Sequence, residues 1–317
     1  MAIGYLYLAL IIFTGLTKGF CGKKTSSFTT KSQDAFFVSV VRMLICTIIG
    51  LVLTIIIDGF DSLKMSSTAI ILGLLSGLFT SIFVVSWLLT VKGSAYMLVD
   101  VVLTISTLIP ILLSVIFFNE SVHYLQIIGF VLLVVAVLIM ASYNNSIKSE
   151  KLNFKSLILL VGCGLANGFN YFVQKCFSTV TPGESFYSFN FYTYLSSTIV
   201  LAILFLVTFK KRGENNSDIL DNDNQTFTSY YLTLLKKIIG FIVIMAVCLF
   251  LNSFFSTLAA SILPSTLQFP LQQGLNLSLS LLMSAIFFKE KITIKSIIGI
   301  VLTFVALIFI NLLPSLI

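Results

Sequence analysis

The chain has 317 residues, of which 58% are hydrophobic and 10% are charged. Because an ordinary soluble domain is about a quarter charged, this chain cannot cover itself with a polar surface, which excludes a soluble globular protein. The net charge of +7 does not indicate nucleic-acid binding, since the basic residues lie beside apolar runs, where an anionic lipid leaflet is their natural neighbour.

Apolar runs of about twenty residues recur along the chain, each long enough to cross a hydrocarbon core of about 30 Å. The runs are continuously apolar rather than alternating, which favours helices over a closed barrel. We therefore predict an all-α integral membrane protein with ten transmembrane helices. In chain order, the predicted spans are Ile3–Gly22, Ala35–Ile57, Thr68–Val91, Ser94–Phe118, Val122–Tyr143, Lys155–Lys175, Ser185–Phe209, Lys237–Ala260, Ser265–Phe288 and Ile292–Leu312.

The connections between these spans predict the orientation of the chain. The one long connection, residues 210–236, is rich in Asn and Asp and is predicted to be a solvated loop. Lys and Arg concentrate in the odd-numbered loops, whereas the opposite side has little beyond Lys64 and Lys175. The positive-inside rule therefore places the odd-numbered loops in the cytoplasm and both termini outside. The expected location is the plasma or inner membrane.

The sequence also contains an internal repeat. Ser114–Glu120 (Ser-Val-Ile-Phe-Phe-Asn-Glu) reappears 170 positions later as Ser-Ala-Ile-Phe-Phe-Lys-Glu, and Gly129 matches Gly299 at the same shift. Near the start of each half, Gly15–Phe20 matches Gly164–Phe169 at a shift of 149 positions. We predict two five-helix repeats, residues 1–150 and residues 151–317.

Five spans per repeat is an odd number, so equivalent helices must cross the membrane in opposite directions. The loops agree, because residues 119–126 contain no Lys or Arg and their counterparts, residues 289–296, contain three lysines. Inverted repeats of this kind are typical of secondary transporters, whose halves move around a site near the membrane midplane.

Polar side chains inside the predicted spans recur at helical spacing, and such side chains tend to face the interior of a bundle. The stripes on the first, fourth, sixth and ninth spans predict one polar cavity, and the eighth span adds Asn252. The substrate-binding residues that we predict are Tyr96, Trp87, Asp100, Thr104, Asn167, Asn170, Gln174, Gln268, Gln272 and Asn276. The alternative is that these groups only hold helices together.

Away from the ends of the predicted spans, the one acidic residue is Asp100, and the comparable basic residues are Arg42 and Lys18. Each would be costly alone in hydrocarbon, so we expect a mutual contact. One interpretation is a fixed ion pair between Asp100 and either Arg42 or Lys18. The other is that Asp100 is alternately protonated and bound to ligand, which would couple transport to proton movement.

These residues resemble a known family. The turns with Glu120 and Glu290, the glycines that follow them, Arg42 in the second span and Lys175 at the end of the sixth resemble the EamA-type drug/metabolite transporter superfamily. The resemblance covers nearly all of the chain and implies a ten-helix transporter of small molecules. The chain departs from the family at Thr193, near the position equivalent to Arg42, and in lacking the usual Trp of the first helix.

Aromatic residues and prolines allow two further expectations. Phe186–Tyr194 opens the seventh span, where an interfacial belt or the wall of a pocket for an aromatic or cationic solute would explain the aromatics. Pro110 and Pro270 can break helical hydrogen bonding in the fourth and ninth spans, beside the polar stripes.

The function predicted is secondary active transport of a small organic metabolite or drug that is amino-acid-like, cationic or aromatic. We expect no catalytic residues, no metal and no cofactor, because the chain has one histidine, His123, and its five cysteines lack metal-type spacing. The alternatives are a lipid-acting membrane enzyme and a receptor or assembly partner that transports nothing. The sequence leaves open the solute, the coupling to protons and the choice between monomer and homodimer.

Overall fold

The computed structural model describes residues 2–29, 32–93, 96–141, 154–215, 227–288 and 294–311, and these are helical apart from short turns. In the first half the helices are α1 (Ala2–Ser26), α2 (Ser32–Leu53), the short turns η1 (Thr54–Asp58) and η2 (Phe60–Leu63), α3 (Ser67–Gly93), α4 (Tyr96–Ser106), α5 (Leu108–Phe118) and α6 (Tyr124–Ala141). In the second half they are α8 (Phe154–Val180), α9 (Phe186–Asn215), α10 (Phe227–Ile262), α11 (Ser265–Phe288) and α12 (Ile294–Asn311).

Each of the ten predicted spans falls on helical structure. Within the described residues, seven helices are long and apolar enough to cross a membrane: α1, α2 with η1, α3, α8, α9, α10 and α11. Three further apolar stretches, Val102–Phe118, Tyr124–Ala136 and Ile297–Ile310, are shorter. A crossing by these three stays a prediction.

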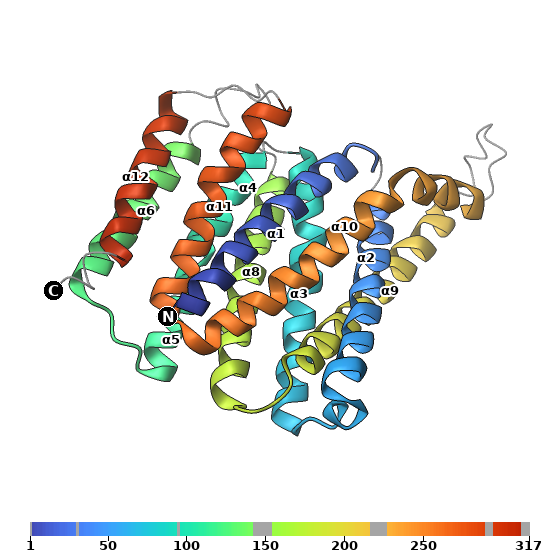
Figure 1. Ribbon diagram of the computed structural model, residues 1–317. Coiled ribbons are helices and arrows are strands. Elements are labelled where there is room, and N and C mark those ends of the chain that lie inside the picture. Colours follow the sequence, from blue (N-terminus) through green and yellow to red (C-terminus); the bar gives the residue numbers. More distant parts are fainter. Residues whose placement is uncertain are drawn as a thin grey trace.

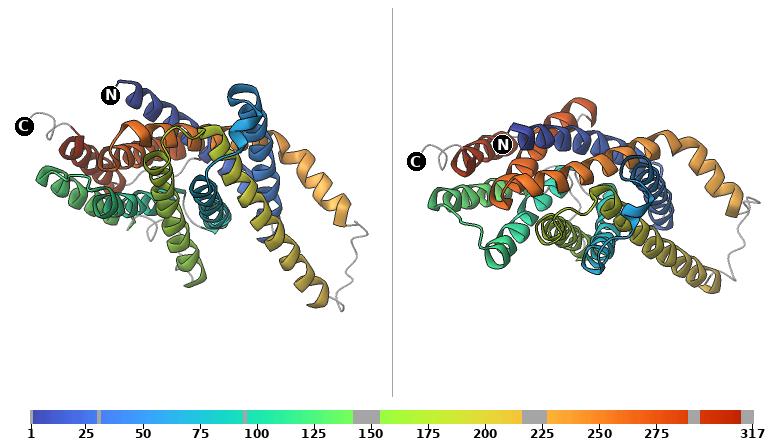
Figure 2. Two further views of the ribbon diagram at one scale, coloured as in Figure 1. Left: turned by 90° about the horizontal axis from the view of Figure 1, so that it is seen from below. Right: turned by 60° about the horizontal axis from the view of Figure 1, so that its bottom comes forward.

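The helices pack in long antiparallel or crossing pairs. α1 lies along α10, α3 along α8, α2 along α9, and α6 along α12 (Figure 1). α6 and α12 form one edge of the molecule, and α2 and α9 lie toward the other (Figures 1 and 2). The first residues of α1 and the last residues of α12 lie on the same side of the bundle, opposite the ends of α1 and α9 that lead into the first and seventh connections (Figure 1).

The distribution of side chains is that of a protein in lipid. Large apolar residues cover the outside, for example Ile116, Leu206 and Ile286, which are 68%, 62% and 71% exposed. Polar side chains such as Gln268 and Ser197 are completely buried. Because hydrocarbon solvates apolar groups and cannot satisfy polar ones, this arrangement indicates a membrane protein rather than a soluble one.

The fourth predicted span is broken in two, at the place that Pro110 indicates. α4 ends at Ser106 and α5 begins at Leu108, and the Thr107 N–H donates to the Thr104 carbonyl at 3.2 Å. Pro110 has no N–H to offer to the preceding turn, so the Ser106 carbonyl loses its helical partner. The helix α11 continues through Pro270, in contrast, because a single missing hydrogen bond can be tolerated within a packed helix.

The connection between α9 and α10 is shorter than the sequence suggests. We predicted a solvated loop over residues 210–236, but α9 continues to Asn215 and α10 already begins at Phe227. A helix bonds its own backbone groups whether its side chains are polar or apolar. The change to polar composition therefore indicates where the membrane ends and not where the helix ends. The facing ends of α9 and α10 project from the bundle in both views of Figure 2.

Candidate functional site

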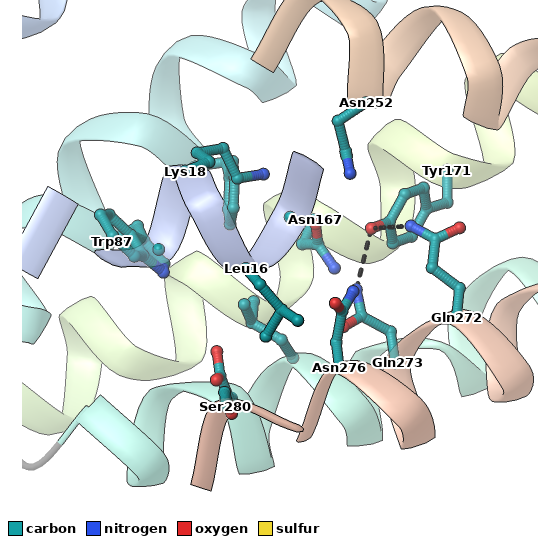
Figure 3. A pocket seen from close by; sticks show the side chains of 15 residues that line it. Leu16, Lys18, Trp87, Asn167, Tyr171, Asn252, Gln272, Gln273, Asn276 and Ser280 are labelled. Carbon is teal, nitrogen blue, oxygen red and sulfur yellow. Dashed lines mark hydrogen bonds between the residues drawn. The ribbon is translucent and has the colours of Figure 1, made fainter. Parts of the chain in front are cut away.

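A cavity lies at the centre of the bundle, where helices from both halves of the chain meet. Its wall is built by α1, α3 and α4 from the first half and by α8, α10 and α11 from the second (Figure 3). The residues that line it are Gly15, Leu16, Lys18, Gly19, Phe83, Trp87, Asp100, Leu103, Asn167, Tyr171, Asn252, Gln272, Gln273, Asn276 and Ser280. This is the combination of the first, fourth, sixth and ninth spans that the polar stripes predict, with α3 and α10 added.

The cavity is small in this conformation. The centres of water molecules can occupy about 50 Å³ of it. One water needs roughly 10–15 Å³ on this measure, so a few waters would fill it. Sites for small organic molecules generally enclose about 300–1,000 Å³, so the helices must move apart to admit such a molecule.

One wall of the cavity is organised around Tyr171 of α8. Its hydroxyl oxygen accepts hydrogen bonds from Nε2 of both Gln272 and Gln273 of α11, each at 2.8 Å (Figure 3). The buried Oε1 of Gln272 and the buried Oδ1 of Asn276 have no donor in the described part of the chain. The α11 wall therefore presents amide oxygens that can accept hydrogen bonds from a ligand.

The other walls are fixed by amides that bridge pairs of helices. Asn252 of α10 donates through Nδ2 to the Ile11 carbonyl of α1 at 2.7 Å and to the Thr14 hydroxyl at 3.3 Å. Asn167 of α8 donates through Nδ2 to the Ser106 hydroxyl at 3.0 Å, at the break between α4 and α5. These bonds cross between helices, so they position the wall as well as line it.

Two charged side chains, Lys18 of α1 and Asp100 of α4, line the same cavity. Lys18 Nζ lies 5.9 Å from the centroid of the Phe83 ring. Arg42 of α2 does not line the cavity, but it is 3% exposed and lies within electrostatic range of Lys18. Both expected partners of Asp100 are therefore in this region, while the ion pair itself stays a prediction.

The structure brings together about half of the residues that we predicted. Lys18, Trp87, Asp100, Asn167, Gln272 and Asn276 line the cavity. Asn170 instead accepts a hydrogen bond from the Ser76 hydroxyl of α3 at 2.7 Å, and Gln174 donates to the Ser253 hydroxyl of α10 at 3.3 Å. Gln268 donates to the Ser256 carbonyl at 2.8 Å, so these three hold helices together.

Of the two remaining predicted residues, Thr104 is described by the structure and does not line the cavity. Thr104 is buried and donates to the Asp100 carbonyl of its own helix at 2.8 Å. The side chain of Tyr96 lies outside the described residues. Sequence reasoning missed Gln273, Ser280 and Phe83, which line the cavity. Gln273 is the neighbour of Gln272, and that adjacency of two long amides inside a span is the signal that could have found it.

A second polar cluster closes the bundle on the side of the termini. Glu120 Oε1, after α5, lies 3.0 Å from Lys175 Nζ of α8, and Glu120 Oε2 accepts the Ser265 N–H at 2.9 Å. Lys175 also donates to the carbonyls of Ala260 and Leu263, at 3.1 and 3.3 Å. The cluster joins α5, α8, α10 and α11, four helices that meet at this end of the bundle.

A sequence profile described as the EamA-like transporter family matches residues 154–312, half of the chain. The chain belongs to the EamA-like transporter family. The protein is therefore a multi-pass membrane protein of a drug/metabolite transporter family, and its substrate is a small molecule. Glu120 and Lys175, two of the residues that carried the resemblance, are in direct contact in the structure.

Comparison of whole structures extends the similarity in fold to the full chain. A solved structure described as "Crystal structure of protein" covers 99% of this chain and 98% of its own, with a TM-score of 0.67 and 12% sequence identity. At this identity the likeness concerns the fold alone. No curated protein matches the chain in sequence.

Proposed function

We propose that this EamA-like protein is a secondary active transporter that moves a small polar organic solute across the plasma membrane by alternating access. The solute would bind in the central cavity, and two inverted five-helix halves, residues 1–150 and 151–317, would open it to each side in turn. The observation that carries the proposal is that a polar cavity at the centre of the bundle takes its wall from both halves of the chain.

The packing of the helices supports two related halves. In the repeat, α1 corresponds to α8 and α3 corresponds to α10. α1 packs on α10, and α8 packs on α3, so this contact occurs in both equivalent forms. Likewise α3 packs on α9 while α10 packs on α2, and α6 pairs with its own counterpart α12. Exchanging the halves therefore leaves the set of helix pairs unchanged, as inverted repeats require.

The repeat extends to individual contacts. A Cβ added to Gly15 would lie 3.1 Å from the Asn276 side chain. One added to Gly164, its counterpart 149 positions later, would meet Val102 and the Cβ of Ser106, and Ser106 is the counterpart of Asn276 at the shift of 170. Equivalent glycines thus let equivalent helices approach closely on both sides of the cavity.

Flux measurements on the full chain in proteoliposomes test the proposal. Amino acids, nucleosides, sugars and cationic dyes would be compared with and without a pH gradient. Asn276→Leu removes a cavity amide whose Oδ1 has no donor, and it should reduce flux sharply. Asn170→Leu is the matched control, because Asn170 bonds to Ser76 outside the cavity. Equal flux through the two variants would contradict transport through this cavity.

The role of Asp100 is tested in the same liposomes. A carboxylate that exchanges a proton during the cycle makes flux depend on the pH gradient, and Asp100→Asn removes that dependence while other driving forces persist. Unchanged proton dependence in Asp100→Asn would favour a fixed ion pair. If no solute of the series is transported, the remaining interpretation is a receptor or assembly partner that transports nothing.

A further inference from the structure

Two positive side chains, one in the wall of the cavity and one within electrostatic range of it, have no hydrogen-bond acceptor in the described residues. The first is Lys18, which lines the cavity and whose ammonium contacts the face of the Phe83 ring. None of the hydrogen bonds or ion pairs between described residues includes its Nζ. A cation–π contact satisfies none of the three N–H donors of an ammonium group, so Lys18 has donors free to bind a ligand.

The second is Arg42 of α2. It is 3% exposed, and its buried Nε has no acceptor in the part of the chain that the structure describes. Its positive charge is within electrostatic range of Lys18, although Arg42 does not itself line the cavity. A buried guanidinium without an acceptor is costly, and a neighbouring ammonium raises that cost.

The charges of this region do not balance by themselves. Among the described residues that line the cavity, Lys18 and Asp100 carry one charge each, and Arg42, which is within electrostatic range of Lys18, adds one positive charge. The α11 wall has unpaired acceptors instead of unpaired donors, because the buried Oε1 of Gln272 and Oδ1 of Asn276 lack donors in the described residues. The cavity therefore offers unpaired donors on one side and unpaired acceptors on the other.

We propose that Lys18 and Arg42 form an anion subsite that binds the carboxylate of the transported solute. This inference rests on the transport function proposed above and narrows its substrate to a small carboxylate, amino-acid-like where the solute also carries an ammonium group. The carboxylate lies against Lys18, the charge of Arg42 adds to the attraction, and a donor group of the same molecule reaches the oxygens of Gln272 and Asn276. A purely cationic solute is disfavoured, since Lys18 in the wall repels it.

The chain provides a direct probe of this subsite. Trp87 is the single tryptophan, lines the cavity, and packs directly on Gly22 of α1, the helix that carries Lys18. Its fluorescence in the purified full chain therefore reports binding in the cavity without any need for flux. The probes are acetate, L-alanine and L-serine, each paired with its neutral amide: acetamide, L-alaninamide and L-serinamide. Each pair differs in the carboxylate and keeps the rest of the molecule.

We expect at least one carboxylate to change Trp87 emission saturably, while its amide does so only at roughly tenfold or higher concentration. Lys18→Met should raise the half-saturating carboxylate concentration by at least about tenfold. Lys64→Met is the control, because it also removes one lysine but from an exposed ion pair with Asp61, and it should leave the half-saturation unchanged. Arg42→Lys keeps the charge and should weaken binding less than Arg42→Gln.

Three results would overturn the subsite: no response to any carboxylate of the series, equal response to carboxylate and amide, or equal half-saturation in Lys18→Met and Lys64→Met. The outcome is separable from that of the transport proposal. Carboxylate-selective binding without flux of any solute would refute transport and keep the subsite. Flux that amides inhibit as well as carboxylates do would keep transport and refute the subsite.

Discussion

Lys175 Nζ lies 3.0 Å from Glu120 Oε1, and each of these two residues is also bound to the end of a helix. Glu120 accepts the N–H of Ser265, the first residue of α11, and Lys175 donates to the carbonyls of Ala260 and Leu263 at the end of α10. A carboxylate at a helix N-terminus and an ammonium at a C-terminus both match the helix dipole. The ion pair therefore also holds the end of α10 to the start of α11.

Lys175→Met should destabilise the protein clearly. It leaves the Glu120 carboxylate, 13% exposed, without its cation, and two carbonyls without a donor. Removing one partner of a buried ion pair costs about 3–5 kcal/mol, and the partial exposure of both groups places this case at the lower end. Lys64→Met is the control, because the Lys64–Asp61 pair is 80% and 92% exposed and contributes little. Thermal unfolding in one detergent should show a lower midpoint for Lys175→Met than for Lys64→Met.

Exchanging the two charges should not restore stability. The double variant Glu120→Lys with Lys175→Glu places an ammonium at the start of α11 and a carboxylate at the end of α10, each against the wrong end of the dipole. We expect an unfolding midpoint no higher than that of Lys175→Met. A midpoint equal to that of the wild type would mean that the contact matters only as a pair of charges.

The positions of the helices could be predicted from sequence, because a membrane requires long apolar runs and these stand out in the chain. The helix ends were less predictable: α10 begins ten residues before Lys237, since polar residues can continue a helix beyond the lipid. The break in the fourth span was foreseeable at Pro110, whose missing N–H acts locally, whereas the continuation of α11 through Pro270 depends on packing around it.

The site shows where sequence patterns stop being informative. Gln268, Gln272 and Asn276 share one stripe, yet Gln272 and Asn276 line the cavity and Gln268 bonds to Ser256 of α10. Each step of four residues turns about 40° around a helix, so the two ends of a stripe face different neighbours. Which neighbour they meet is set by tertiary packing, as it is for Asn170, which bonds to α3 while the adjacent Tyr171 lines the cavity.

Gly168→Ala should disturb the cavity through its backbone. A Cβ at Gly168 would lie 2.6 Å from the Ser106 carbonyl, at the break between α4 and α5, and 2.7 Å from Ile109. Such overpacking typically costs about 1–3 kcal/mol and would push α8 away from α4. Because Asn167 bonds to the Ser106 hydroxyl, the displacement reaches the cavity wall, so both the unfolding midpoint and the flux should fall.

Gly162→Ala is the matched control for this variant. Gly162 is also inside α8, but a Cβ there would have no neighbour within 4 Å. Alanine is favoured over glycine in a helix by up to about 1 kcal/mol, so Gly162→Ala should leave the midpoint unchanged or raise it slightly. A decrease of the same size in both variants would show that close contact between α8 and α4 is not the cause.

Tyr171→Phe should weaken ligand binding more than it weakens the fold. The change removes the oxygen that accepts from Nε2 of both Gln272 and Gln273, and two buried amide groups then lack their partner. An unpaired buried donor costs about 1–3 kcal/mol, and the amides can recover part of it by turning into the cavity, which misplaces Gln272 for a ligand. We expect the half-saturating concentration, followed by Trp87 fluorescence or by flux, to rise about tenfold.

Tyr192→Phe separates this effect from a general loss of a tyrosine hydroxyl. Tyr192 donates to the Leu63 carbonyl at 2.9 Å and does not line the cavity, so its loss removes one hydrogen bond from the packing of α9. Its variant should lower the unfolding midpoint and leave half-saturation unchanged. If Tyr171→Phe behaves in the same way, the pairing of Tyr171 with Gln272 and Gln273 serves only to hold α8 against α11. A shift in half-saturation confined to Tyr171→Phe would show that the same bonds also position the amides that meet the solute.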